Sequence, residues 1–548
     1  MKQVKLTSLI LIFSFVLTLA VPAFASGGSP FTDVKTTRWS YEAIQYAVDS
    51  GCMNGVGDGK FDPAGSMTRG MFVTVLYRKE GAPEVEFRPD FSDVKSGKYY
   101  SKAVIWAKDN GIVSGVTETA FDPNGKITRE QLATMIYRYC TVKNLYVDER
   151  GDVSSFSDKG KIHSYAADAM SWAVEKKLIS GMTKDTLDPR GLATREQVAT
   201  ILKRFDETEI MTLADYYRPY VEQMADHAEV MLREEIEWAK AHPDSFDFLN
   251  WDYGMLVIGL TEAGREDVVK DYVDLWLNSS HRDEILPCDP GLAGYGVLWL
   301  WEKTGDQKYA DLSKEFLDSF DRWSTDSMGE ITYGGPGSRD IYVDGTGMVT
   351  PFLARYAADF GDEDVRRIAA LQVTNYMKMG IDPARHLAFH GYTFGGTPMG
   401  EMGWGRGTGW LMLAVGSVIR YCDDDNADEI CDKFIGYTMK YLKPEYKFGW
   451  TLSPLEDDAP SDTSATGMIM WGVMQAKLKG LASSVSDETL RAIAKAGLTD
   501  VCDGVVKGSS GGAGGFGAYS EEYDENNGWG QGGLLSFYAL FLRYLDGN

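Results

Sequence analysis

A short unit that occurs three times in the N-terminal part of the chain constrains the fold more than any other feature. The letters FTDV at 31–34 recur as FSDV at 91–94, and FSD stands at 156–158. Each is followed by an amphipathic helix pattern, a turn (FDPAGSMTRG, FDPNGKITRE or LDPRGLATRE) and a second helix pattern. Self-similarity of this kind is the signature of a repeat architecture. We therefore expect three small helical repeats, at residues 30–85, 90–145 and 155–208.

The second helix of each repeat begins with the same residue types. A threonine stands where the N-cap belongs, at Thr68, Thr128 and Thr194, and an arginine follows it. A helix N-terminus together with an arginine can form an anion site, although a solvated helix start is the simpler interpretation of one arginine alone. Because the Thr-Arg pair recurs at the same position in all three repeats, the anion site is the favoured interpretation. The candidate residues are Arg69, Thr128, Arg129, Glu130, Thr194, Arg195 and Glu196, and the first copy departs from the Thr-Arg-Glu pattern at Gly70.

This triple pattern resembles the S-layer homology (SLH) domain, and all three copies match it over residues 30–206. The resemblance implies that the three repeats anchor the protein to the cell wall. Such triplets bind an anionic, often pyruvylated, secondary cell-wall polysaccharide, which would hold the protein non-covalently on the bacterial cell surface.

Residues 1–25 have the pattern of a secretory signal. Lys2 and Lys5 precede an apolar stretch at 6–21, and Ala-Phe-Ala at 23–25 forms a cleavage site. A membrane anchor is the alternative, but the apolar stretch is short and ends at Pro22. Because no later segment is long and apolar enough to cross a bilayer, we expect a secreted protein without a transmembrane segment after cleavage.

The composition excludes several classes of function. A net charge of −25 and a pI near 4.7 argue against binding to nucleic acid. Six cysteines are scattered without a CxxC pair, so a zinc site is not indicated, and we expect neither a metal nor another cofactor. A length of 548 residues predicts two or more domains.

Residues 213–548 change to a pattern of consecutive helices with few strand signals. Six helical hairpins closed into a ring would form an (α/α)6 barrel, so the expected fold class is mainly α, with an open helical solenoid as the alternative. Long loops rich in glycine and aromatic residues, at 329–340, 386–403 and 508–528, fit the mouth of a barrel better. The expected helices cover 213–241, 250–263, 265–279, 289–305, 306–322, 343–361, 362–380, 404–422, 426–443, 461–483, 486–503 and 529–546.

The helix starts on the long-loop side contain the residues that could perform chemistry. The stretch MGWGRGTGWLML at 402–413 combines glycines that permit close approach, tryptophans on which sugar rings can stack, and an arginine suited to a carboxylate. Helix capping explains single aspartates such as Asp289 and Asp344, but not the aromatic residues at the same end. Together they fit a uronic-sugar site. The candidates are Asp344 and Asp289 for catalysis, and Trp251, Tyr253, Tyr342, His390, Trp404, Arg406, Trp410 and Trp529 for substrate binding.

Six motifs make this half of the chain similar to a known enzyme family. DPG at 289–291, YVDGTGM at 342–348, HGY at 390–392, WGRGTGW at 404–410, DTSATGM at 462–468 and WGQGG at 529–533 resemble the unsaturated rhamnogalacturonyl hydrolases (glycoside hydrolase family 105) and, more distantly, the unsaturated glucuronyl hydrolases of family 88. The resemblance implies an unsaturated uronyl oligosaccharide as substrate, with unsaturated galacturonyl-rhamnose the first choice. Such enzymes hydrate the C4=C5 bond of the terminal uronic acid, and the unstable adduct opens and releases the rest of the sugar.

The same resemblance implies a role for each candidate residue. Asp344 protonates the double bond and then deprotonates water, while Asp289 is the partner carboxylate. His390 and Arg406 orient the substrate or water and pair with the uronate, and the aromatic rings form stacking walls. An inverting glycosidase or a polysaccharide lyase on the same barrel remains an alternative, as does a non-catalytic surface-layer protein that binds glycan.

Overall fold

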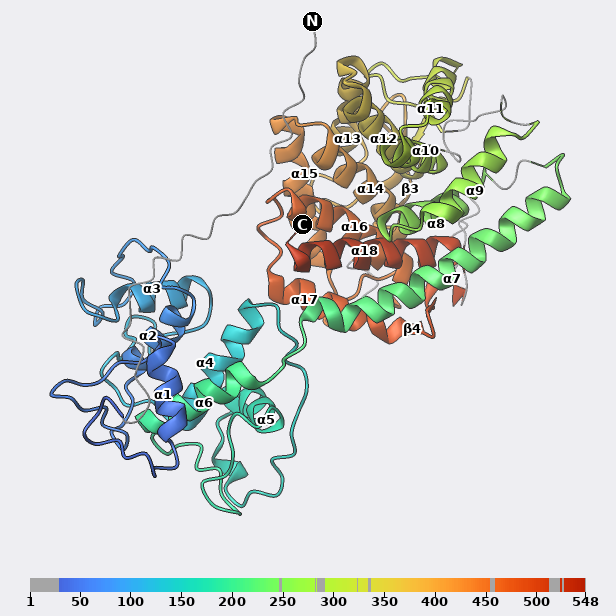
Figure 1. Ribbon diagram of the computed structural model, residues 1–548. Helices are drawn as coiled ribbons and strands as arrows, with labels where there is room; N and C mark the ends of the chain where they lie inside the picture. Colours follow the sequence, from blue (N-terminus) through green and yellow to red (C-terminus); the bar gives the residue numbers. More distant parts are fainter. Residues whose placement is uncertain are drawn as a thin grey trace, which may run out of the picture. The chain divides into compact units, whose positions relative to one another are not determined.

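The computed structural model describes residues 29–245, 249–280, 282, 291–322, 324–333, 337–453, 459–511, 523–524 and 527–547. The expected signal peptide lies outside these residues. The chain divides into two compact units, Met1–Leu213 and Ala214–Asn548, and each is described by itself (Figure 1). Among the described residues, no helix is long and apolar enough to cross a membrane.

The first unit consists of three helix pairs, one from each repeat. They are α1 (Tyr41–Asp49) with α2 (Arg69–Lys79), α3 (Ser101–Asp109) with α4 (Arg129–Val142), and α5 (Ala167–Glu175) with α6 (Arg195–Glu207). Two short 3-10 helices, η1 (Lys159–Lys161) and η2 (Ser164–Ala166), precede α5. The side chains of Thr68, Thr128 and Thr194 cap α2, α4 and α6, as the sequence predicted.

Backbone hydrogen bonds close the three repeats into a ring. The N–H of Met67 donates to Ala193 O (2.8 Å), that of Ala193 to Ile127 O (3.0 Å), and that of Ile127 to Met67 O (3.0 Å). Each of these residues lies just before the second helix of its repeat, so the three second helices start around one point. Every repeat therefore depends on the other two for its backbone pairing.

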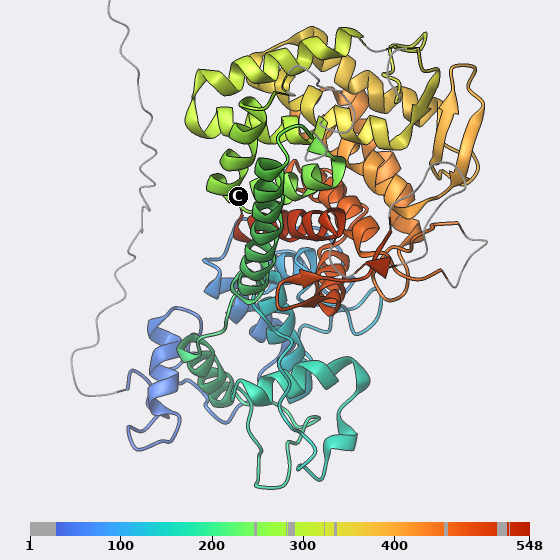
Figure 2. The ribbon, with the colours of Figure 1, turned by 90° about the vertical axis from the view of Figure 1, so that its right-hand side faces the viewer.

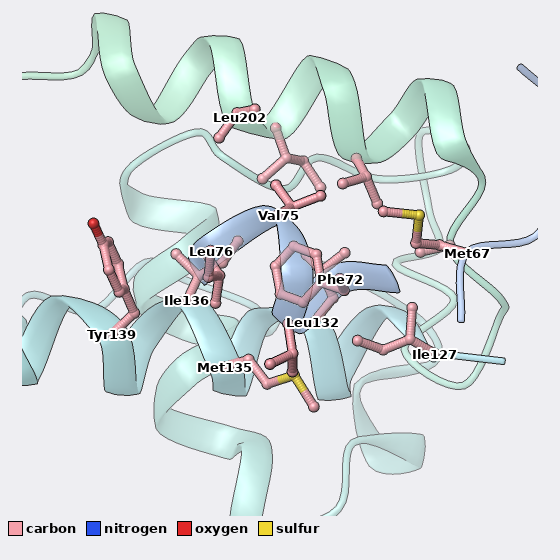
Figure 3. Packing of buried hydrophobic residues seen from close by; sticks show 14 of the residues in the cluster. Met67, Phe72, Val75, Leu76, Ile127, Leu132, Met135, Ile136, Tyr139 and Leu202 are labelled. Carbon is pink, nitrogen blue, oxygen red and sulfur yellow. The ribbon is translucent and has the colours of Figure 1, made fainter. Parts of the chain in front are cut away.

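The second helices form the apolar core of this ring. Figure 3 shows Phe72 and Leu76 of α2 facing Leu132 and Ile136 of α4, and Leu202 of α6 packs in the same cluster. These side chains are at most 6% exposed. One repeat alone would leave this surface in water, and the unit gains its stability by burying the surfaces against one another.

In the second unit, six helices among the described residues form a closed inner ring (Figures 1 and 2). They are α8 (Trp251–Glu262), α10 (Gly291–Thr304), α12 (Val343–Phe360), α14 (Gly405–Tyr421), α16 (Thr463–Leu478) and α18 (Gly528–Asp546). Each packs on the next one, and α18 returns to α8. A ring that closes on itself rules out the open solenoid, and the expected helical barrel is confirmed.

The outer helices alternate with the inner ones along the chain. They are α7 (Leu213–Ala241), α9 (Glu266–Leu277), α11 (Gln307–Ser319), α13 (Glu363–Met379), α15 (Asp425–Thr438) and α17 (Asp487–Gly497), and the 3-10 turns η5 (Phe320–Arg322), η6 (Met439–Tyr441) and η7 (Leu498–Asp500) extend three of them. Because an outer helix leads back from each inner one, all inner helices run in the same direction.

Close contacts between inner helices depend on small residues. A Cβ at Gly347 of α12 would lie 2.4 Å from the carbonyl oxygen of Trp410 on α14, and one at Gly532 of α18 would lie 2.1 Å from Met255 O on α8. Real Cβ atoms do not approach so closely, so these glycines allow the helices to pack backbone against backbone. The glycines of the sequence motifs therefore also have a packing role.

Short strands connect the helices at the N-terminal ends of the inner ring. β1 (Asp340–Tyr342) and β3 (Pro398–Met402) flank β2 (Phe389–Thr393) in an antiparallel sheet, and β1 runs directly into α12. Two smaller pairs follow, β4 (Val501–Cys502) with β5 (Val505–Val506), and β6 (Ser509–Ser510) with β7 (Tyr523–Asp524).

Ion pairs hold the C-terminal ends of the inner helices together. Glu262 at the end of α8 is buried and accepts hydrogen bonds from Arg420 of α14 (3.3 Å) and Arg543 of α18 (2.6 Å). Tyr295 of α10 also donates to it, at 3.2 Å. A buried carboxylate is tolerated because it has several donors, and it fixes how four helices meet at this end of the ring.

Candidate active site, wall-binding grooves and relatives

The carboxylate of Asp344 lies in the first turn of α12, directly after β1. Its Oδ1 is 3.2 Å from Nε2 of His390, whose side chain is 2% exposed, while the Asp344 side chain is 18% exposed. The two residues meet because β1 pairs with β2, placing Tyr342 opposite Gly391. A Cβ at position 391 would lie 2.4 Å from Ile341 O, so the glycine of the HGY motif is what lets the strands come so close.

Aromatic rings hold the imidazole of His390 in place. The Tyr342 ring meets it edge-on with centroids 5.6 Å apart, and the Trp404 ring lies 4.8 Å away. Trp404 is 4% exposed, whereas Tyr342 is partly exposed beside Asp344. The arrangement leaves one carboxylate accessible and one histidine fixed behind it, which suits proton transfer to a bound molecule.

Arg406 is buried beside two of the aromatic rings of the site. Its guanidinium lies 5.2 Å from the Trp404 ring centroid and 5.5 Å from that of Trp529, and the side chain is 2% exposed. Nη1 donates to Ser510 O (2.8 Å) and Nη2 donates to Gly511 O (2.7 Å). We expected this arginine to pair with the substrate carboxylate; in the structure these two donors bind Ser510 of β6 and Gly511, which follows it.

A buried carboxylate completes the surroundings of the arginine. Asp462 caps α16 by accepting from the N–H groups of Ser464 and Ala465, and its Oδ2 accepts from Ser510 Oγ at 2.5 Å. The same Ser510 hydroxyl accepts from Arg406 Nη1 at 3.0 Å. Burial lowers the pKa of Arg406, and the negative charges of Asp462 and Asp344 oppose this shift. The arginine therefore contributes a positive field without reaching the surface.

The remaining aromatic candidates divide into two groups. Trp251 and Trp529 are partly exposed and pack 4.7 Å apart at the starts of α8 and α18. Trp410 is 1% exposed and meets the edge of Trp251 from within the ring. Tyr253 is turned toward α7, where burial and a hydrogen bond to Glu235 raise its pKa.

Two further observations concern the carboxylates Asp289 and Glu330. Asp289, the expected partner of Asp344, lies outside the described residues. Glu330, which no motif singled out, is 0% exposed and hydrogen-bonds with Thr346 and Tyr392, each two residues from Asp344 or His390. The position of Glu330 in the long loop at 329–340 was the one sequence feature that could have pointed to it. Among the described residues, no cluster of three or more His, Cys, Asp or Glu could hold a metal ion.

The arginines that begin the second helices of the repeats are bound to neighbouring repeats. Arg129 Nε donates to Leu187 O (2.9 Å) and its Nη2 to Ser180 O (2.7 Å). Arg69 contacts Phe121 O and Ser114 O in the same way, and Arg195 contacts Phe61 O and Asn54 O. All three arginines are at most 6% exposed. They connect repeat one to two, two to three, and three to one, and the departure at Gly70 does not alter this contact.

The glutamates that follow these arginines also lie between repeats. Glu196 accepts from Arg38 Nε at 2.7 Å and from Ser40 Oγ at 2.6 Å, both in the first repeat. Glu130 Oε1 lies 2.5 Å from Nδ1 of His163, in the third repeat. The threonines cap their helices, so every predicted wall-binding residue has a partner within the ring.

Two grooves open above these buried arginines. One has a volume of about 390 Å³ and is lined by Arg69, Arg138 and the half-exposed Tyr165, among others. The other has a volume of about 170 Å³ and is lined by Arg129, Arg204 and the exposed Trp39. Each groove combines a buried arginine, a rim arginine and an exposed aromatic ring, a combination that suits an anionic sugar.

Comparison with known proteins assigns both parts of the chain. A family model described as Glycosyl Hydrolase Family 88 matches residues 223–545, more than half of the chain. The chain belongs to Glycosyl Hydrolase Family 88. The model of the S-layer homology domain matches residues 30–70, 90–133 and 155–199, so three SLH repeats precede the family 88 domain.

Solved structures with a similar fold include a family 105 glycoside hydrolase from C. acetobutylicum ATCC 824, which is 19% identical. The match covers 59% of this chain and 99% of that one, with a TM-score of 0.48. An unsaturated glucuronyl hydrolase from Bacillus sp. GL1 is 17% identical, with 60% and 97% coverage and a TM-score of 0.46.

Curated relatives match a smaller part of this family 88 protein. An endoglucanase of Bacillus sp. (strain KSM-635) is 32% identical over 209 residues, which is 37% of this chain and 22% of the relative. A surface-layer 125 kDa protein of Lysinibacillus sphaericus is 30% identical over 175 residues, which is 31% of this chain and 14% of the relative. The chain thus spans between about a seventh and a fifth of the length of these two relatives.

Proposed function

We propose that this family 88 protein removes 4,5-unsaturated uronic acid from the non-reducing end of oligosaccharides that a polysaccharide lyase has produced. Membership of the family supports a saccharide substrate. The observation that carries the proposal is the partly exposed carboxylate of Asp344, with Oδ1 3.2 Å from Nε2 of the buried His390, at a mouth lined with aromatic rings. Unsaturated galacturonyl-rhamnose is the proposed first substrate.

The proposed reaction needs one group that acts as acid and then as base. Protonated Asp344 gives its proton to C4 of the enol ether, and the charge that develops at C5 is met by water. The carboxylate then accepts a proton from that water, so it returns to its initial state. The resulting hydroxyl at C5 makes the adduct unstable, the ring opens, and the linked sugar leaves. Asp289 would supply the second carboxylate, and Trp251 and Trp529 the stacking faces.

The experiment that tests this function is ultraviolet spectroscopy with a panel of lyase-generated unsaturated disaccharides. The double bond absorbs in the ultraviolet, so hydration removes the absorbance with time. A polysaccharide lyase would instead increase it on intact polysaccharide, and an inverting glycosidase would release saturated sugar without changing it. Failure to decrease the absorbance of any unsaturated disaccharide would refute the proposal.

We further propose that the SLH repeats bind an anionic secondary cell-wall polysaccharide through the two grooves and keep the enzyme at the cell surface. The support is the pairing of rim arginines Arg138 and Arg204 with exposed aromatic rings over buried positive charge. Purified wall should pull down the intact protein, and the double variant Arg138→Glu, Arg204→Glu should remain in the supernatant. Undiminished binding by that variant would exclude the grooves as the binding site.

A further inference from the structure

Residues 324–332 form a tight hairpin that is fixed to α13. Asp326 N–H donates to Glu330 O, and Glu330 N–H donates to Asp326 Oδ1, both at 2.9 Å. Gln372 of α13 accepts from Ile331 N–H at 2.9 Å and donates to Gly329 O at 3.0 Å. The hairpin backbone is therefore held on both sides, and the direction of the Glu330 side chain is fixed.

The Glu330 side chain points between the two elements that carry the proposed catalytic pair. Its Oε1 lies 3.3 Å from the Thr346 hydroxyl on α12, and its Oε2 contacts the Tyr392 hydroxyl on β2. Thr346 is two residues after Asp344, and Tyr392 is two residues after His390 on the same face of the strand. One carboxyl group thus connects the helix of the acid to the strand of the histidine.

The surroundings of this carboxyl group favour its neutral form. The side chain is 0% exposed, and among the described residues no Lys, Arg or His forms an ion pair with it. The charged group that faces it from its own hairpin is Asp326, which is negative; β2 contributes Tyr392, and α12 contributes the uncharged Thr346. Burial above all, and then Asp326, raise the pKa of Glu330 well above its ordinary value, against the hydroxyl contacts that lower it.

We propose that Glu330 is a positioning residue that, as a neutral carboxylic acid, holds the strand bearing His390 against the helix bearing Asp344. The proposal rests on the proposed function. A neutral acid accepts from the Thr346 hydroxyl through one oxygen, and the O–H on its other oxygen donates to the hydroxyl oxygen of Tyr392. Both contacts are then satisfied without a buried charge. Ionisation would place an unpaired negative charge behind the catalytic pair and loosen the connection.

The test compares Glu330→Gln with Glu330→Ala in the full-length protein on unsaturated disaccharides. The amide of Gln reproduces the acceptor and the donor of a neutral acid, so we expect kcat near that of wild type at neutral pH. Ala removes the connection, and a displacement of the catalytic pair should lower kcat by about 10–100-fold while KM changes little.

Two further variants separate positioning from general loss of stability. Tyr392→Phe removes one of the two contacts and should lower kcat in the same direction as Glu330→Ala. Tyr538→Phe removes another buried hydroxyl, that of Tyr538 on α18, which donates to Ala494 O on the outer helix α17. This variant should have a lower melting temperature but an unchanged kcat. Equal kcat values for wild type and a folded Glu330→Ala variant would overturn the proposal. So would a Gln variant as impaired as the Ala variant, because it would mean that the charged form is needed.

A second readout does not depend on activity. The unfolded chain releases the Glu330 proton near pH 4.3, whereas the native protein keeps it to a higher pH, so native stability falls as the pH rises between these points. Gln cannot titrate, and its melting temperature should rise relative to wild type as the pH is raised through that window. A pH-independent difference would refute the neutral acid. Wild-type protein that leaves every disaccharide intact would refute the proposed function, while this measurement would still decide the state of Glu330.

Discussion

Replacing Arg129 with alanine tests whether the repeat arginines hold the ring together or bind the wall. The structure predicts the former, because both contacts of the guanidinium are to carbonyl groups of the third repeat. Leu187 O is buried and would lose its donor, at a cost of about 1–3 kcal/mol. Ser180 O is near the surface and can be rehydrated, so only the net value of that hydrogen bond, about 1 kcal/mol, is lost.

The two effects together predict a loss of about 2–4 kcal/mol of unfolding free energy. For a unit of this size, each kcal/mol shifts the melting temperature by about 2–4 °C, so a decrease of about 4–16 °C is expected. Differential scanning calorimetry of the full-length protein measures it. The transition of the barrel is identified by the simultaneous loss of hydrolase activity, and the other transition belongs to the repeats.

Arg138→Ala is the matched control. Arg138 is on the same helix and lines the groove above Arg69, but among the described residues its side chain makes one hydrogen bond, to Ser114 Oγ at 3.5 Å. Its loss should change stability by no more than about 0.5 kcal/mol and should reduce wall binding. An Arg129→Ala variant that melts like wild type yet no longer binds wall would refute the structural reasoning and restore the arginine as a direct ligand.

Three further predictions concern the barrel. Asp344→Asn should lower kcat by about 10²–10⁴-fold with an unchanged melting temperature, because it removes proton transfer but keeps the size of the side chain; a well-folded variant with the parent rate would move the role to another group. Gly347→Ala should destabilise the barrel by about 1–3 kcal/mol in a denaturant titration, because its Cβ would lie 2.4 Å from Trp410 O, and an unchanged midpoint would contradict that contact. Burial alone would raise the pKa of Glu262, but its arginine partners lower it below the ordinary value, so stability present above about pH 4.3 should be lost as the pH falls through the folded-state pKa. Calorimetry between pH 7 and pH 3 should show a steeper loss for wild type than for Glu262→Gln.

The helical framework could be predicted from sequence because its signals are local. The helix expected at 362–380 is observed at Glu363–Met379, where Asp362 caps one end and Gly380 follows the other. The apolar periodicity of the inner helices and the alternation of loop lengths then indicate hairpins. Closure of the ring follows from glycines such as Gly347, which the sequence shows but whose contact with another helix it does not.

Sequence patterns could not identify hydrogen-bond partners that lie far apart along the chain. Arg406 is bound to Gly511 O, which is 105 residues away along the chain, and a backbone carbonyl has no signature in the sequence. An arginine in a glycine-rich motif therefore looks the same whether it faces a substrate or supports a loop. Glu330 presents the opposite case, since its position in a long loop does not by itself indicate an acid that will be fully buried.

The helix starts of the repeats show why local sequence could not reveal the partners of the predicted anion-binding residues. A free helix N-terminus offers N–H groups to an anion. Here, however, Arg129 N–H donates to Gly191 O (3.0 Å) and Glu130 N–H to Pro189 O (2.9 Å), so the neighbouring repeat already occupies these donors. The same geometry that makes the residues good anion ligands makes them good partners for carbonyl oxygens. At the grooves Arg138 is partly exposed and Arg204 is exposed, and we propose that a wall glycan meets these two arginines first.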